Sequence, residues 1–232
     1  MKNRHLTLIC AAVAVLAAPL PALADVAGNI AVTTKYKYRG QDQSDPAESV
    51  LPAVQGGFDY SLGGFYVGNW NSSVGFLGGT EMDFYGGYRG EFGPVAYDVG
   101  LLHYYYPGAT SAADTTEIYG SVGYGPVSLK YSSTVSSKYF GIVDGQGTGY
   151  LEVNAKWEAT KGLYLIGHYG TTQFSSDAKA GGAVNYSDFK VGVDYDLGGG
   201  FTLGGAYAGA NKKSTYGDIN KSRFLLTVTK AL

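Results

Sequence analysis

The chain has 232 residues and a formal net charge of −2, with 36 glycines, 21 tyrosines and a single cysteine, Cys10. It lacks the basic surplus of a nucleic-acid-binding protein, and one cysteine supplies neither a disulfide framework nor a thiolate metal site. We therefore expect no nucleic-acid partner, no metal and no cofactor. Abundant tyrosine and glycine without cysteine pairs are typical of an exported β-protein.

The N-terminus has the three parts of a secretory signal peptide. Lys2 and Arg4 make it basic, residues 6–20 form an apolar core, and small residues lead to a cleavage site between Ala24 and Asp25. No later stretch has the roughly 18 consecutive apolar residues of a membrane-spanning helix. The predicted organisation is a cleaved signal peptide over 1–24 and one domain over 25–232.

The first predicted strand covers residues 29–39. Its polarity alternates, as side chains on opposite faces of a strand do, and its polar face includes Lys35, Lys37 and Arg39. A polar loop over 40–50 follows.

The third predicted strand covers residues 65–74. It places Tyr66 and Trp70 on one face and Asn69 and Asn71 on the other. The pattern predicts that the aromatic face is the apolar one.

The clearest hairpin spans residues 81–106. Apolar and charged side chains alternate along its first half, and Gly93-Pro94 turns the chain into a second strand. The charged face of the first half carries Glu81, Asp83, Arg89 and Glu91.

The same alternation predicts twelve strands of about ten residues in all. They cover residues 29–39, 53–62, 65–74, 81–92, 95–106, 116–124, 127–135, 150–159, 163–174, 187–197, 201–209 and 222–232.

The connections alternate strictly between tight and long. Five are tight, at 63–64, 93–94, 125–126, 160–162 and 198–200, and six are longer. An even number of antiparallel strands with short periplasmic turns and long extracellular loops is typical of a bacterial outer-membrane barrel. The predicted fold is therefore all-β, a transmembrane antiparallel up-and-down β-barrel of about twelve strands, and a secreted β-sandwich is the alternative.

Aromatic residues gather at the predicted strand ends, where amphipathic rings suit the two membrane interfaces. We expect an interfacial belt made of Tyr36, Tyr38, Tyr60, Phe65, Phe92, Tyr97, Tyr104, Tyr105, Tyr106, Tyr124, Phe174, Phe189 and Phe201.

If the apolar parity faces lipid, the other parity lines the lumen. The predicted lumen-lining residues are Lys35, Lys37, Arg39, Asp59, Glu81, Asp83, Arg89, Glu91, Asp98, Glu117, Lys130, Glu152, Lys156, Glu158, Asp188, Lys190, Asp194, Asp196 and Arg223. These charges could pair across strands and seal the barrel, or they could line an ion- or solute-selective channel. Twelve strands fall between barrels filled by side chains and open porins, so both alternatives stay open.

The sequence offers little for catalysis. Outer-membrane lipases use a Ser–His pair on the outer wall, and His103 falls on the lipid-facing parity, but no nucleophile signature accompanies it. We expect no enzymatic activity, with a lipase as the remote alternative.

Several segments are similar to one known family. Residues 36–40, 54–58, 64–74, 81–83 and 105–107 resemble the Gcw_chp or TorF-like family of proteobacterial exported proteins, regarded as outer-membrane porins. The resemblance implies an outer-membrane barrel and no particular substrate. The chain ends in Leu232, whereas outer-membrane barrels usually end in an aromatic residue that the assembly machinery reads.

These observations favour a porin-like channel for passive diffusion of small hydrophilic solutes or ions in the outer membrane. The expected partners are outer-membrane lipid, periplasmic chaperones and the assembly machinery. The alternative is a non-conducting surface barrel whose extracellular loops bind a partner.

Overall fold

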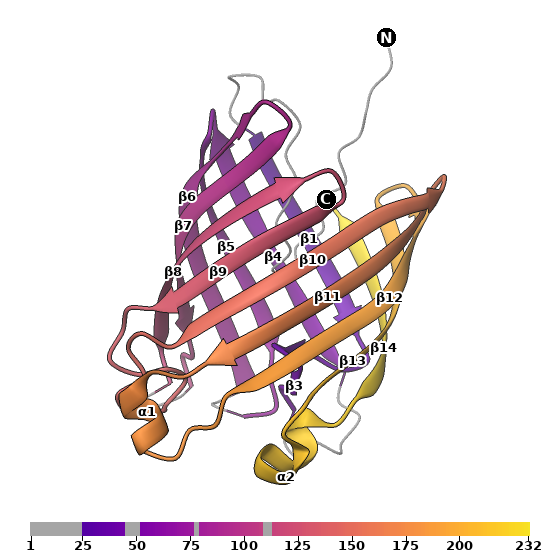
Figure 1. Cartoon of the computed structure of the whole chain (residues 1–232). Helices are drawn as coiled ribbons and strands as arrows, with labels where there is room; N and C mark the ends of the chain where they lie inside the picture. The colour runs from indigo at the N-terminus through magenta and orange to yellow at the C-terminus, as the bar shows by residue number, and fades with distance from the viewer. Residues whose placement is uncertain (1–24, 45–51, 77–78, 109–112) are drawn as a thin grey trace.

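The computed structural model describes residues 25–44, 52–76, 79–108 and 113–232, which fold into a closed antiparallel barrel (Figure 1). The predicted signal peptide lies outside the described residues. Twelve strands follow one another around the ring in chain order, and β1 pairs with β14 to close it. They are β1 (Asp25–Thr33), β4 (Ala53–Leu62), β5 (Phe65–Ser73), β6 (Thr80–Phe92), β7 (Val95–Tyr105), β8 (Thr115–Tyr124), β9 (Val127–Thr134), β10 (Gly149–Thr160), β11 (Leu163–Gln173), β12 (Tyr186–Gly198), β13 (Phe201–Ala210) and β14 (Arg223–Ala231). The predicted fold class is confirmed.

All tight turns lie at one end of the barrel, which we refer to as the tight-turn end (Figure 1). Gly93 and Gly125 have φ angles of 58° and 55° there, a region that glycine enters without steric cost. The opposite end, the loop end, carries two helical loops. They contain α1 (Ser176–Ala180), α2 (Lys213–Tyr216) and the 3₁₀ turn η2 (Gly217–Asn220), and no helix of the described chain is long and apolar enough to cross a membrane.

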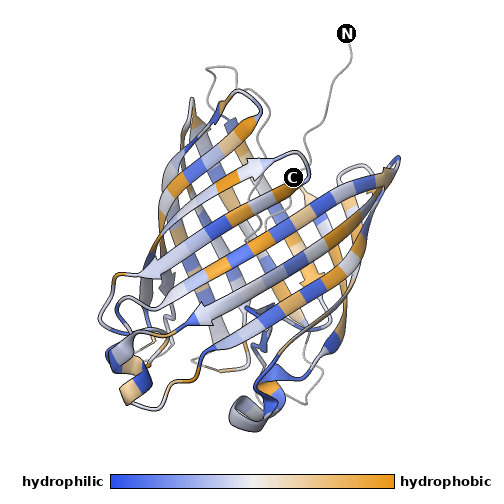
Figure 2. Ribbon diagram, viewed as in Figure 1, coloured by the Kyte–Doolittle hydropathy of each residue, from blue (hydrophilic) through white to orange (hydrophobic). Residues whose placement is uncertain are grey.

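The outer wall is apolar, and the inner wall is polar. Figure 2 shows hydrophobic and hydrophilic residues alternating along β10 and β12. Phe92 and Trp157 on the outer face are 84% and 58% exposed, whereas Glu81 and Glu117 on the inner face are 1% exposed. Side chains of the two parities therefore face two different environments, as a barrel in lipid requires.

The predicted faces of the third strand are reversed. Tyr66 is 8% exposed on the inner face of β5, and Val67 is 58% exposed on the outer face. Asn69 and Asn71 share that outer face, where their amides donate to the backbone carbonyls of Asp83 (3.1 Å) and Gly56 (3.3 Å). Two asparagines can lie on the apolar face because the sheet itself satisfies their donors.

The first predicted strand is too long. β1 ends at Thr33, and residues 34–44 leave the wall as a hairpin made of β2 (Lys37–Tyr38) and β3 (Gln41–Asp42). Arg39 and Gly40 have φ angles of 45° and 75°, as the two central residues of a tight hairpin turn do. We refer to residues 34–44 as the lumen hairpin.

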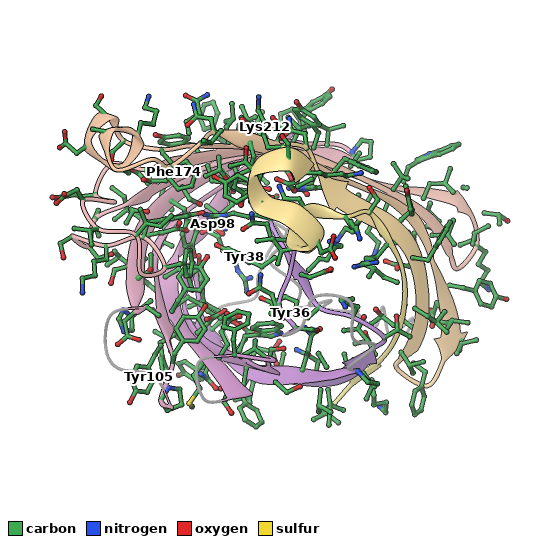
Figure 3. The ribbon with its side chains drawn as sticks, turned by 90° about the horizontal axis from the view of Figure 1, so that it is seen from below. Tyr36, Tyr38, Asp98, Tyr105, Phe174 and Lys212 are labelled. Atoms are coloured by element: carbon green, nitrogen blue, oxygen red, sulfur yellow. The ribbon has the colours of Figure 1, made fainter. Side chains whose placement is uncertain are left out.

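Several predicted interfacial aromatics instead fill the loop end of the lumen. Tyr104 and Tyr106 are each 3% exposed, and they pack with Tyr38 and Phe140 in one buried cluster. Figure 3 shows Tyr36 and Tyr38 inside the ring of strands, with Tyr105 pointing outwards. A second cluster at the loop end contains Phe174, which is 4% exposed, with Tyr139, Ala178, Tyr186 and Ala210.

Candidate functional site: the barrel lumen and its inserted hairpin

The turn of the lumen hairpin rests directly on the barrel wall. A Cβ atom added to Gly40 would overlap Cβ of Asp188 on β12 and lie 2.8 Å from the carbonyl oxygen of Gly209 on β13. Glycine is therefore required at this position both by its φ angle and by the close contact.

Arg39 reaches across the lumen to β8. Its guanidinium donates to both carboxylate oxygens of Glu117 at 2.9 and 2.8 Å, and the two side chains are 6% and 1% exposed. The guanidinium carbon also lies 4.1 Å from the ring centre of Tyr150 and 4.9 Å from that of Tyr38. A planar guanidinium suits a two-pronged carboxylate contact and a stacked ring at once, which lysine does not.

Three cationic side chains surround the carboxylate of Asp42 at the base of the hairpin. This carboxylate lies 2.9 Å from Nζ of Lys37, 3.3 Å from Nε of Arg223 and 4.0 Å from Nζ of Lys35. Burial lowers the pKa of Lys37, and the Asp42 carboxylate acts in the opposite direction. Asp42 thus joins the hairpin to the start of β14.

The hairpin is also held by η2. Lys37 Nζ donates to the carbonyl of Ile219 at 3.3 Å, and the Gln41 amide donates to the side chain of Asn220 at 2.9 Å. The helical loop before β14 therefore lies over the hairpin, as the view from the loop end shows (Figure 3).

Tyrosine hydroxyls join the hairpin to carboxylates on the wall. Tyr36 and Tyr106 donate to the two oxygens of Glu81, at 2.8 and 2.5 Å. Tyr38 and Tyr104 share a hydrogen bond of 2.6 Å. The sequence signal for this role was absent, because tyrosines near a strand end look the same whether they face lipid or the lumen.

Several predicted lumen-lining residues lie nearer the tight-turn end. Lys156 of β10 lies 3.6 Å from Asp194 of β12 and 4.7 Å from the ring centre of Tyr164. Tyr85 donates to Asp59 at 2.7 Å. The predicted residues Glu91, Glu158 and Asp196 are exposed at the rim.

Asp83 stands apart among the buried acids. It is 7% exposed on β6, and its Oδ1 atom has no hydrogen-bond partner within the described part of the chain. It lies one inward-facing position from Glu81, and Tyr36 and Tyr106 donate to Glu81 only.

The two histidines among the described residues, His103 and His168, lie on opposite faces. On the inner face, His168 Nε2 lies 2.8 Å from Asp188 and Nδ1 lies 2.7 Å from the amide oxygen of Asn154. The ambiguous sequence pattern gave no indication of this cluster. On the outer face, His103 Nδ1 lies 2.9 Å from the hydroxyl of Thr116.

Within the described ranges, no group of three His, Cys, Asp or Glu side chains is arranged to hold a metal ion. The polar groups of the lumen are ion pairs, carboxylates and tyrosine hydroxyls, and such groups can bind a polar solute.

Comparisons with known proteins agree with this architecture. Residues 20–231 match the model of a family described as "Bacterial protein of unknown function (Gcw_chp)", and no curated protein matches the sequence. The KdgM porin is similar in structure, with a TM-score of 0.59 and 8% identity over 88% of this chain and 98% of its own. The NanC porin gives 0.57 and 9% over the same shares. At such identities the similarity shows the fold alone.

Proposed function

Because the chain belongs to the Gcw_chp family of bacterial proteins and shares the closed barrel of the KdgM and NanC porins, we propose that it is an outer-membrane channel. Small hydrophilic solutes or ions diffuse through it passively, along a narrow lumen of mixed charge. It carries out no catalysis.

One observation carries this proposal: ionic side chains line the inside of a ring whose outside is apolar. Burying charged groups in a barrel interior is costly unless partners or water compensate them, and a structural role alone is served as well by apolar packing. A polar interior over the whole length of the barrel is what a hydrated solute needs.

The lumen hairpin sets the width of this path. It fills the loop end with Tyr36, Tyr38 and Arg39, whereas the tight-turn end has no comparable insertion among the described residues. In the usual orientation of such barrels, the tight-turn end faces the periplasm and the hairpin narrows the extracellular half. To insert into the outer membrane, the barrel requires the periplasmic chaperones and the assembly machinery that outer-membrane barrels share.

Planar bilayer recording tests the proposal. Purified wild-type protein should show discrete conductance steps, and replacing residues 36–43 by a glycine–serine linker of equal length should enlarge them. Replacing only the exposed residues of α1 (176, 177, 179 and 180) by glycine and serine, with the buried Ala178 kept, is the matched control and should leave the steps unchanged. A folded wild-type barrel that stays silent would refute the channel.

A second candidate is a non-conducting surface barrel whose loops bind a partner. The buried aromatic clusters around Tyr104 and Tyr139 favour it, because they fill the loop end with packed side chains. It predicts silence in bilayers both for the wild type and for the linker variant, so the same recordings separate the two candidates.

A further inference from the structure

Lysine and arginine side chains in the lumen differ in whether a carboxylate pairs with them. Those of the hairpin are matched by acids: Lys37 by Asp42 at 2.9 Å, and Arg39 by Glu117 at 2.8 Å. Across the part of the chain that the structure describes, no carboxylate lies within ion-pair distance of Arg89, Lys130 or Lys190. These three cations therefore lack a carboxylate partner of their own.

The three unpaired cations lie beyond the hairpin, toward the tight-turn end. Arg89 follows Glu81, a hairpin contact, by eight residues along β6, and Lys190 follows Asp188 by two along β12. Lys130 is the fourth residue of β9, which begins at the tight-turn end. A solute that passes the hairpin therefore meets these side chains next.

Two of the cations contact aromatic rings instead of acids. The Arg89 guanidinium carbon lies 5.1 Å from the ring centre of Tyr66, and Lys130 Nζ lies 4.1 Å from that of Tyr119. The ring face attracts the positive charge, but it does not accept the N–H groups that lie in the plane of the Arg89 guanidinium. Arg89 Nε is buried and has no hydrogen-bond partner among the described residues.

Glycines on the wall make room for these rings. A Cβ atom on Gly87 would lie 2.6 Å from the Tyr66 hydroxyl, and one on Gly100 would lie 2.5 Å from the Tyr119 hydroxyl. The two hydroxyls also hydrogen-bond to each other. The hydroxyl ends of both rings therefore lie against the backbone of the wall.

Two carboxylates that face Arg89 and Lys130 already accept hydrogen bonds from other groups. Asp98 is opposite Arg89 in register and accepts from the Tyr66 hydroxyl at 2.6 Å. Glu152 is opposite Lys130 and accepts from the side-chain amide two positions along its own strand at 2.9 Å.

Lys190 has an acid on either side of it along β12. Asp188 accepts from the Tyr150 hydroxyl at 3.1 Å, and Asp194 pairs with Lys156 at 3.6 Å. The acids near the three cations thus offset much of their charge, but each is occupied by another donor. What the three cations lack is a carboxylate at contact distance.

We propose that Arg89, Lys130 and Lys190 form an anion-binding step in the lumen, and that the channel prefers small organic oxyanions such as carboxylates. The inference rests on the proposed channel function. A carboxylate supplies what the three side chains lack, which is a charged acceptor for buried donors. The guanidinium of Arg89 would orient it, and the two ammonium groups would attract it as point charges.

Reversal potentials test this step. In a potassium chloride gradient, and again in potassium gluconate, the wild type should show an anion-preferring reversal potential. Arg89→Gln, Lys130→Gln and Lys190→Gln should each lower the anion-to-cation permeability ratio, by about fivefold for a charge that meets the ion at contact distance in water. Lys179→Gln is the matched control, because it removes one positive charge from the exposed surface of α1 and should leave the ratio unchanged.

The outcomes separate the anion-binding step from the channel itself. Two results would overturn the anion-binding step and leave the channel standing. One is a conducting wild type that prefers cations, and the other is glutamine variants with the same permeability ratio as the wild type. A silent wild type would remove the channel and this step with it. Heat-dependent migration on gels, a property of folded outer-membrane barrels, would confirm that each variant is folded.

Discussion

Replacing Glu117 by Gln should release the lumen hairpin. Glu117 is 1% exposed and holds both prongs of the Arg39 guanidinium, so the substitution leaves a buried cation without its anion. Breaking one side of a buried ion pair costs about 3–5 kcal/mol. The strand ladder does not depend on this pair, and the hairpin can relieve the cost by leaving the wall. The docked-to-undocked ratio should therefore fall by about a hundred- to several-thousand-fold.

A cysteine in the hairpin would report this change. Ser44 is 7% exposed when the hairpin is docked, and residues 25–232 contain no other cysteine. In a Ser44→Cys background, the rate of maleimide labelling should rise with Glu117→Gln, and open-channel noise should rise with it. Lys156→Met, which breaks a partly exposed pair away from the hairpin, is the control and should label as the parent does.

A double variant checks that the cost comes from the unpaired charge. Arg39→Met combined with Glu117→Gln removes both charges and leaves an apolar side chain among the rings, and such replacements are often close to neutral. Labelling should return toward the parent rate. If Glu117→Gln labels no faster than the parent, the ion pair does not hold the hairpin and the reasoning is refuted.

Three further predictions concern other parts of the barrel. Gly40→Val should also speed labelling at a hairpin cysteine, because its Cβ would overlap Asp188; an unchanged rate would mean that the turn does not rest on the wall. Val153→Arg, on the outer face of β10, should lower the free energy of unfolding in lipid by about 2–4 kcal/mol, with Val153→Ala as the control; equal stability of the two would argue against lipid contact there. Purified protein should show no esterase activity. If the wild type did hydrolyse esters and His103→Ala did not, the lipase alternative would be supported.

Alternation in the sequence predicts the barrel well because its cause is local. Each strand residue faces either lipid or lumen, so the polarity of Tyr150 to Trp157 in β10 records the two environments directly. The tight turns are equally local, since Gly93 and Gly125 serve a backbone geometry that glycine adopts most easily.

The lumen hairpin could not be predicted in this way. Residues 35–39 continue the alternation of β1, and nothing in their own pattern says that the wall ends at Thr33. What places them is a set of partners far along the chain, Glu117 at a separation of 78 residues and Arg223 at 181 from Asp42. The same limitation reversed the predicted faces of β5, where the partners of Asn69 and Asn71 are backbone carbonyls on the neighbouring strands.

The seam where β1 meets β14 imposes an order on folding. It has five residue pairs, Asn29 to Thr33, against nine between β1 and β4. Arg223, an ionic partner of Asp42, begins β14, the last strand of the barrel in chain order, so the hairpin gains this contact only when β14 is in place. Contacts between such distant residues form late, because the loop that they close is long. The hairpin can therefore reach Glu81 and Glu117 before β14 forms, whereas its contact with Arg223 and the closing seam both wait for the last strand of the barrel.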